Sequence, residues 1–255
     1  DLATIRYRME NWRPDVIHCF KPKGYAGLAG CLARCWQHLG AYHGRLIIDE
    51  DDWEGPGGWN DLEPYPWGLR RAFARQERWG LRHADAVTVA SRTLQSLAWS
   101  LGIPPASVHY LPNGCTRPRP GDGARVRERY ALGQAPVVLL YTRFFEFDVA
   151  RPLEVLRSVL REAPDAHLLV VGTALYPAQD ERFDALAAEP GLQGRVVRTG
   201  WVPQEALPDY FAAADAAIYP FDDTLVNRCK CAVKLIDLLA AGVPVVADAV
   251  GQNSE

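Results

Sequence analysis

Basic residues in the C-terminal half have the types and positions needed to bind phosphate. Arg143 directly follows the apolar run 137–141, and a guanidinium can hold phosphate oxygens with two parallel hydrogen bonds. Lys234 falls in the first turn of a helix predicted over 233–241, where unpaired backbone N–H groups already attract anions. Lys230 lies shortly before it. These residues are candidates for a diphosphate site; the alternative is that they are ordinary solvated side chains.

Polar residues near the ends of apolar runs in the N-terminal half are candidates for a second site. His18 is expected to end a strand and to face a sugar or the edge of the core. The acids 49–52 follow the run 45–48, and four neighbouring carboxyls resist full ionisation. They could bind a metal or an acceptor hydroxyl, with Asp52 first, or form a solvated loop. Segment 53–61, rich in Trp and Gly, suits a sugar ring or lipid-linked acceptor, unless it is a packed lid.

The elements that position these residues alternate along the chain. Short apolar runs are separated by helical patterns, which predicts parallel sheets covered on both faces. A Pro- and Gly-rich stretch interrupts the pattern at 116–123. We therefore expect an α/β protein with two Rossmann-like domains facing a central cleft, over residues 1–117 and 135–255, joined by a linker at 118–134. Ligands of such sheets bind beyond the carboxyl ends of the strands.

Bulk properties exclude several classes of protein. The chain has 255 residues and a net charge of -3, so a general affinity for nucleic acid is not expected. It contains no transmembrane-length apolar run and no signal-peptide pattern, which favours a cytoplasmic location. The six cysteines lack the spacing and histidines of a zinc site and are interpreted as free thiols. No Walker A loop, dinucleotide fingerprint or Ser-His-Asp signature is present, and we expect neither a cofactor nor a required metal.

The order of several short motifs is more specific. The segments 13–18 (RPDVIH), 84–91 (ADAVTVAS) and 111–114 (LPNG) resemble the N-terminal domain of group 1 glycosyltransferases. The segments 138–143, 168–172, 200–220 and 234–246 (KLIDLLAAGVPVV) resemble the C-terminal domain. Because these segments follow the family's order and spacing, the chain is identified as similar to the retaining glycosyltransferase family 4, which has the GT-B fold.

The resemblance implies a donor site in the C-terminal half for UDP-, GDP- or another nucleoside-diphosphate sugar. It places Arg143 on the pyrophosphate and Asp237, in place of a family glutamate, on the ribose, with Gly172 and Leu235 beside them. The family's usual lysine is replaced by Asp148, which would repel phosphate, so Lys230 and Lys234 become the expected cations. The family's first glutamate is replaced by Cys229, so the expected sugar contacts are Asp222, Asp223 or Asn227.

The expected activity is transfer of a hexose, with retention, to a carbohydrate or lipid-linked acceptor. Catalytic candidates are Arg143, Lys234, His18 and Asp52. Another GT-B enzyme, such as a sugar-nucleotide epimerase, and a non-catalytic nucleotide-sugar-binding homologue are the alternatives. The resemblance also implies family segments before Asp1 and after Glu255. Peripheral association with the inner face of a membrane is a further expectation.

Overall fold

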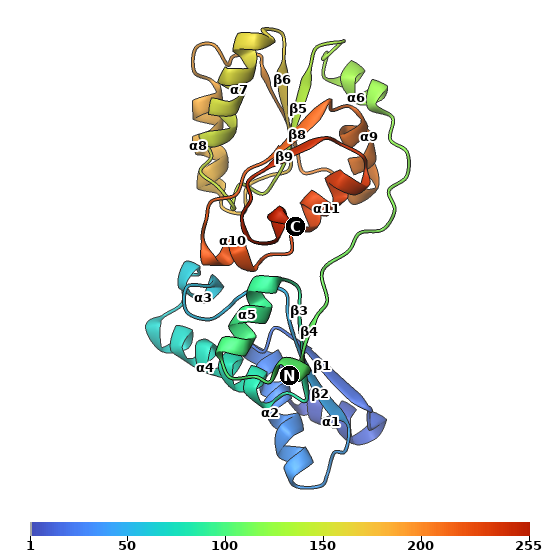
Figure 1. Ribbon diagram of the computed structural model, residues 1–255, viewed down its shortest axis with the longest axis vertical. Helices are drawn as coiled ribbons and strands as arrows, with labels where there is room; N and C mark the ends of the chain where they lie inside the picture. The colour runs from blue at the N-terminus through green and yellow to red at the C-terminus, as the bar shows by residue number, and fades with distance from the viewer. Residues whose placement is uncertain (1) are drawn as a thin grey trace. The chain divides into compact units, whose positions relative to one another are not determined.

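The computed structural model describes residues 2–255 and divides the chain into two compact units. Unit 1 contains the chain up to Asn113, the segment Asp223–Cys231 and Glu255. Unit 2 contains Gly114–Asp222 and Ala232–Ser254. Each unit is a parallel sheet with helices packed around it (Figure 1). The expected α/β fold with two parallel sheets is confirmed.

Unit 1 is built on four parallel strands in the order β1-β2-β3-β4. Its central strands bury Leu46, Ile48, Val87 and Val89 almost completely. The carboxyl ends of β1 and β2 meet, because Phe20 pairs with Asp49. The elements are α1 (Leu2–Trp12), β1 (Val16–Phe20), α2 (Gly24–His38), β2 (Arg45–Glu50), α3 (Trp59–Leu62), α4 (Trp67–His83), β3 (Ala86–Val89), α5 (Arg92–Ser100), a 3-10 turn at Pro105–Ser107, β4 (Val108–Tyr110) and α10 (Leu225–Cys229).

Unit 2 has five parallel strands in the order β7-β6-β5-β8-β9. Neighbouring residues of β5 enter different cores: Leu139 belongs to one apolar cluster and Leu140 to another. A sheet buried on both faces requires this pattern. The elements are α6 (Gly123–Arg129), β5 (Val137–Tyr141), α7 (Arg151–Glu162), β6 (His167–Val171), α8 (Pro177–Ala187), β7 (Val196–Gly200), a 3-10 turn at Gln204–Ala206, α9 (Leu207–Ala212), β8 (Ala216–Tyr219), α11 (Val233–Ala240), β9 (Val245–Ala247) and a 3-10 turn at Gly251–Ser254.

The units divide the chain differently from the boundaries expected from composition. Helix α6 lies within the interval 118–134 that was expected to be a linker, and it packs on α9. The carboxylate of Asp122 starts this helix by accepting a hydrogen bond from the Arg125 N–H at 3.2 Å. Segment Asp223–Cys231 lies between two elements of unit 2 in sequence but belongs to unit 1.

Candidate donor site

The loop after β5 presents Arg143 at the carboxyl end of the second sheet. Thr142 and Phe144 on either side are buried, whereas Arg143 is exposed. The Thr142 hydroxyl accepts a hydrogen bond from the Phe144 N–H at 2.8 Å. Phe144 adopts a φ of 53°, which is unusual for a bulky side chain. Its ring is packed against Phe183, with centroids 4.7 Å apart, so core packing holds the turn in this conformation.

Gly172 allows the ends of three neighbouring strands to approach closely. Its φ is +115°, and a Cβ at this position would lie 2.1 Å from the carbonyl oxygen of Thr142. The Gly172 N–H donates to the carbonyl of Gly200 at 3.0 Å. The Leu175 N–H donates to the carbonyl of Arg143 at 2.8 Å. The loops after β5 and β6 are therefore fixed to each other beside Arg143.

Lys234 lies in the first turn of α11, as the sequence predicted. The N-cap residue of this helix is Ala232, whose side chain makes no capping hydrogen bond, and the start of a helix carries a partial positive charge. The Lys234 ammonium lies over the ring of Tyr141, with Nζ 5.6 Å from the centroid. Tyr141 is the last residue of β5. Lys234 therefore lies at the carboxyl end of β5, where the loop with Arg143 begins.

Asp237 follows Lys234 by one turn on α11 and shares its surroundings. Burial raises the pKa of the Asp237 carboxyl, and the charge of Lys234 partly offsets this. Burial, together with the charge of Asp237, also raises the pKa of the Tyr141 hydroxyl. The structure therefore brings a cation, a carboxylate and a phenol together at the carboxyl end of β5.

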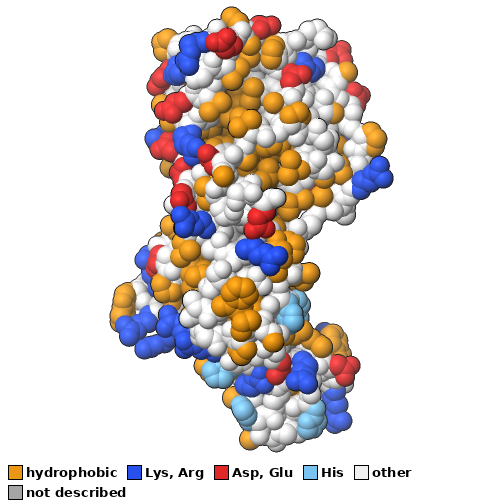
Figure 2. Space-filling model, viewed as in Figure 1, with side chains coloured by type: hydrophobic (Ala, Val, Ile, Leu, Met, Phe, Trp, Pro, Cys, Tyr) orange, Lys and Arg blue, Asp and Glu red, His pale blue; other side chains and the backbone are white. Residues whose placement is uncertain are grey.

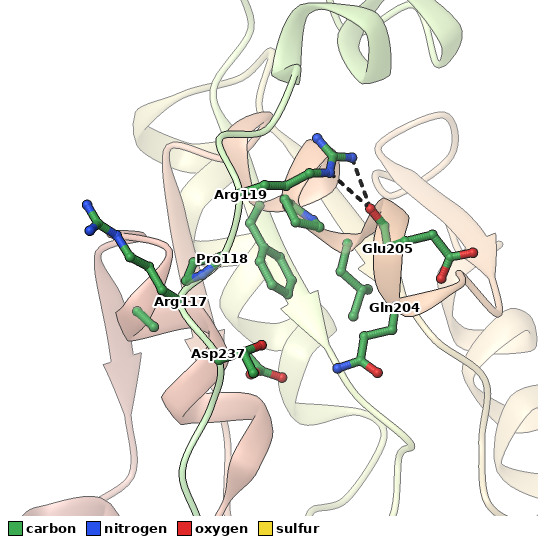
Figure 3. A pocket seen from close by; sticks show the side chains of 11 residues that line it. Arg117, Pro118, Arg119, Gln204, Glu205 and Asp237 are labelled. Atoms are coloured by element: carbon green, nitrogen blue, oxygen red, sulfur yellow. Dashed lines mark hydrogen bonds between the residues drawn. The ribbon is translucent and has the colours of Figure 1, made fainter.

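A cavity of about 390 Å³ within unit 2 is bordered by Asp237 (Figure 3). Gln204 and Asp237 direct their polar ends towards the open space, whereas Arg117 points away from it. The remaining walls are Thr116, Pro118, Arg119, Glu205, Leu207, Pro208, Phe211 and Ala240. Phe211 supplies an aromatic wall and contacts Tyr141, with ring centroids 5.4 Å apart. Five apolar and six polar or charged side chains line the cavity, so it could hold a small molecule that has both apolar and polar parts.

Charged hydrogen bonds fix one wall of this cavity. Arg119 donates to the Glu205 carbonyl at 2.9 Å and pairs with the Asp209 carboxylate at 2.9 Å. The same carboxylate oxygen accepts a hydrogen bond from the Asp122 N–H at 2.9 Å. The Arg119 side chain and the Asp122 amide lower the pKa of Asp209. The segment before α6 is therefore attached to α9 and does not act as a loose linker.

Asp148 has a structural partner. Its carboxylate accepts a hydrogen bond from the Ala150 N–H at 2.8 Å and pairs with Arg182 at 3.1 Å. The Ala150 amide, followed by Arg182, lowers the pKa of Asp148. We predicted from the sequence that Asp148 would repel a bound phosphate. In the structure its carboxylate instead pairs with Arg182 and accepts a hydrogen bond from the N–H of Ala150 at the start of α7.

Three other predicted donor residues are placed differently from Lys234 and Asp237. Lys230 and Asn227 belong to unit 1, and Lys230 Nζ lies 5.4 Å from the ring centroid of Trp59. Leu235 is buried in the core of unit 2, and its N–H already donates to the Ala232 carbonyl at 3.0 Å. Within the structure, the grouped donor candidates are therefore Arg143, Gly172, Lys234 and Asp237.

Cys229, which occupies the family's first glutamate position, is a core residue of unit 1. It is fully buried, and burial raises the pKa of its thiol to about 12. A thiol with this pKa stays protonated near neutral pH and is a poor nucleophile. Cys229 therefore acts in packing, and it cannot replace a carboxylate at a sugar.

The N-terminal candidates form a separate cluster at the carboxyl end of the first sheet. His18 lies within β1, two positions before its end, and was wrongly expected to end the strand. Its Nε2 lies 3.8 Å from the Asp49 carboxylate, which accepts a hydrogen bond from the Thr88 hydroxyl. Strand β2 also continues through Glu50, so two of the four acids are strand residues.

Lysines after β1 balance the acids after β2. Lys21 donates to Asp52 at 2.9 Å, and Lys23 donates to Glu54 at 2.7 Å. Burial acts to lower the pKa of Lys21, but the nearby carboxylates of Asp52, Asp51 and Glu54 raise it overall. Residues 2–255 contain no grouping of His, Cys, Asp or Glu arranged to hold a metal ion. The sequence signal for these pairs was the lysines at the end of one strand facing acids at the end of the next.

The Trp- and Gly-rich segment after these acids is packed. Trp53 is 7% exposed and belongs to the core of unit 1. Its Nε1 donates to the Pro56 carbonyl at 2.9 Å. The Trp59 N–H donates back to the Trp53 carbonyl at 2.9 Å, where α3 begins. This packing favours a packed segment over an open surface for a sugar ring at residues 53–61.

The chain has two α/β units, each built on a parallel sheet, and the second carries cations and a carboxylate at the carboxyl end of a strand. These features define a protein of GT-B architecture. HepE of Anabaena, solved with UDP, superposes with a TM-score of 0.69 at 18% identity over 99% of this chain and 64% of its own. Sucrose-phosphate synthase of Thermosynechococcus elongatus gives a TM-score of 0.69 at 22% identity over 98% and 60%. These likenesses support the fold alone.

Family comparison assigns both units. Residues 2–114 match the glycosyl transferase 4-like domain, and residues 135–255 match the glycosyl transferases group 1 domain. The chain belongs to the group 1 glycosyltransferases.

Curated relatives agree with this assignment. A GDP-mannose-dependent alpha-(1-6)-phosphatidylinositol monomannoside mannosyltransferase of Mycolicibacterium smegmatis is 33% identical over 78% of this chain and 51% of its own length. The 2-deoxystreptamine glucosyltransferase of Streptomyces kanamyceticus is 28% identical over 69% and 45%. The chain thus spans about half the length of the curated relatives it matches. No helix within residues 2–255 has the length and apolar character needed to cross a bilayer.

Proposed function

We propose that this protein binds a nucleoside-diphosphate sugar in unit 2 and transfers its hexose to a carbohydrate or lipid-linked acceptor. The observation that carries the proposal is the grouping of Lys234 and Asp237 on α11 beside Tyr141, next to a cavity of about 390 Å³. The loop that carries Arg143 begins at the end of the same strand, β5. The group 1 glycosyltransferase domain match supports the same activity.

In this proposal the nucleoside occupies the cavity and Asp237 accepts hydrogen bonds from the ribose hydroxyls. Lys234, the first turn of α11 and Arg143 bind the diphosphate. During transfer the bond from the sugar's anomeric carbon to the diphosphate breaks, and a bond to an acceptor oxygen forms with retention. The proton of the acceptor hydroxyl passes to the departing diphosphate. Cations fixed beside the departing diphosphate stabilise the charge that develops there. Because side chains supply this charge, we propose that no metal ion is required.

The donor proposal ranks GDP-mannose first. Relatives at 33% and 32% identity are named as GDP-mannose-dependent enzymes. A nucleoside-diphosphate glucose is second, because a relative at 28% identity is named as a glucosyltransferase. A non-catalytic homologue is the alternative, and it is favoured by the absence of a carboxylate at Cys229.

Calorimetric titration of the wild-type chain with GDP, UDP, guanosine and uridine tests the site. Hydrogen bonds to charged groups contribute roughly 1.5–3 kcal/mol. Arg143→Ala and Lys234→Ala should therefore each weaken binding of the preferred diphosphate by about ten- to a hundredfold and leave its nucleoside nearly unaffected. Arg161→Ala, on the exposed face of α7, is the matched control. Equal losses for nucleoside and diphosphate would show that Arg143 and Lys234 only support the fold.

Turnover separates a transferase from a binding homologue. Hydrolysis of GDP-mannose and UDP-glucose should be measurable in the presence of a metal chelator. The released GDP or UDP is the quantity to be measured. Binding of the diphosphate without any turnover of a panel of nucleotide sugars would favour the non-catalytic alternative.

A further inference from the structure

Helix α4 presents a continuous basic face to solvent. Arg71, Arg75, Arg78 and Arg82 recur at intervals of four, three and four residues, so they lie on one side of the helix. All four side chains are exposed. The acid of this helix, Glu77, is 1% exposed and faces the opposite side. The whole chain carries a net charge of -3, so this concentration of positive charge is local.

These arginines are not used in ion pairs within the described part of the chain. Arg71 lies over the ring of Trp67, with Cζ 5.4 Å from its centroid. Arg82 donates to the Leu101 carbonyl at 2.9 Å. Neither contact neutralises charge. Figure 2 shows Lys and Arg side chains gathered over α4, with few acids among them. Like charges held together without counterions favour an anionic partner.

Apolar side chains accompany the basic face. A groove of about 720 Å³ runs between α2 and α4, with Leu28, Ala72 and Trp79 among its apolar lining. Arg75, Arg78 and Arg82 line the same groove. At the ends of the two helices, Trp67 is 74% exposed and Tyr25 is 71% exposed. Basic and aromatic side chains therefore share one surface, here called the α2/α4 surface and defined by these residues.

We propose that the α2/α4 surface docks the protein on a bilayer that contains anionic phospholipids. Arginines on an amphipathic helix pair with lipid phosphates, while Trp and Leu side chains enter the boundary between headgroups and acyl chains. The exposed indole of Trp67 and the apolar groove favour this partner over RNA, because they offer burial in hydrocarbon in addition to charge. The proposal does not depend on the identity of the sugar donor.

Vesicle flotation tests the docking surface with the full chain. The wild type should float with phosphatidylcholine vesicles containing about one third phosphatidylglycerol, and it should not float with pure phosphatidylcholine. Raising the salt to about 0.5 M should release it, because screening shortens the reach of charge. Each arginine near the surface contributes about 1 kcal/mol. Arg75→Glu with Arg78→Glu should therefore lower the vesicle-binding constant by about thirtyfold or more.

The matched control is Arg129→Glu with Arg161→Glu, two exposed arginines of unit 2 that change the net charge equally. This pair should bind vesicles within about twofold of the wild type if docking is local. Trp67→Ala should weaken binding severalfold at constant charge. Equal losses in the two arginine pairs, equal flotation with neutral vesicles, or no flotation at all would overturn the proposal. So would binding of an RNA oligonucleotide through Arg75 and Arg78 in place of vesicles. Circular dichroism checks that each variant is folded.

Discussion

The ammonium of Lys234 lies over the ring of Tyr141, with Nζ 5.6 Å from the ring centroid. Lys234 lies in the first turn of α11 and Tyr141 is the last residue of β5, so this contact ties the start of the helix to the carboxyl end of the central strand of the second sheet. A long flexible lysine loses side-chain freedom when it binds phosphate. A ring that already restricts the ammonium reduces this loss.

Tyr141→Leu should therefore weaken nucleoside-diphosphate binding by about two- to fivefold, the value expected for loss of an exposed cation–π contact. Tyr141→Phe keeps the aromatic face and should bind like the wild type. Titration calorimetry with GDP or UDP makes the comparison. A loss in the Phe variant equal to that in the Leu variant would assign the effect to the hydroxyl.

Asp237→Asn should weaken binding of nucleoside and diphosphate by the same factor, about tenfold or more, because its proposed partner is the ribose. Glu205→Gln, which changes another carboxylate on the wall of the same cavity, should have little effect. Nucleoside binding that survives in Asp237→Asn would remove Asp237 from the ribose.

Gly172→Ala should destabilise unit 2 by several kcal/mol. Its Cβ would overlap the Thr142 carbonyl oxygen, and its φ of +115° is strained for any L side chain. Gly191→Ala is the control, because that glycine has a φ of +87° and an added Cβ there would meet no atom within 4 Å. The control should cost only about 1–2 kcal/mol. Urea unfolding followed by circular dichroism measures both, and equal costs would contradict the close approach.

Glu77 should make unit 1 less stable as the pH rises. Burial raises the pKa of its carboxyl to about 8, so the folded chain keeps a proton that the unfolded chain releases above about pH 4.5. The free energy of unfolding should decrease as the pH rises from about 4.5 to about 8, and it should level off above pH 8. Burial raises the pKa of Glu50 as well, so this carboxyl contributes a loss of stability in the same direction.

Glu77→Gln should flatten this pH dependence and raise stability at pH 9. An amide oxygen can still accept the hydrogen bond that Glu54 N–H donates to Glu77 at 2.9 Å. Tryptophan fluorescence during urea unfolding reports mainly on unit 1, because Trp201 is the one tryptophan outside it. An unchanged pH profile in the variant would show that Glu77 is already ionised in the folded protein.

The alternation of apolar runs and helical patterns was sufficient to predict the parallel sheets. Strands buried on both faces, such as β5 and β6, need continuous apolar sequences. The stretch 118–134, which composition predicted to be a linker, contains a helix that Asp122 caps, and prolines and glycines precede this helix. The cap and the Arg119–Asp209 pair depend on contacts with α9, which lies far along the sequence.

Part of the candidate donor site could also be predicted from local sequence patterns. Lys234 and Asp237 are neighbours on one helix, so their proximity follows from spacing alone. Lys230 and Asn227 looked equally close in sequence, but the segment that carries them belongs to unit 1. Local periodicity does not reveal which core a short segment joins. The partners of Asp52 and Glu54 were missed because Lys21 and Lys23 come from a different strand end.

Segment Asp223–Cys231 has a consequence for how the protein can be divided. Its Cys229 is completely buried in the core of unit 1, and Asn113 donates to the Cys231 carbonyl at 3.2 Å. A protease that cut near Arg117 would therefore separate the chain into pieces that each hold part of unit 1. The larger piece would remain attached to the smaller through α10, without a covalent bond, and the two would copurify. A recombinant fragment that starts at Ala135 would instead expose the apolar side of α10 to water.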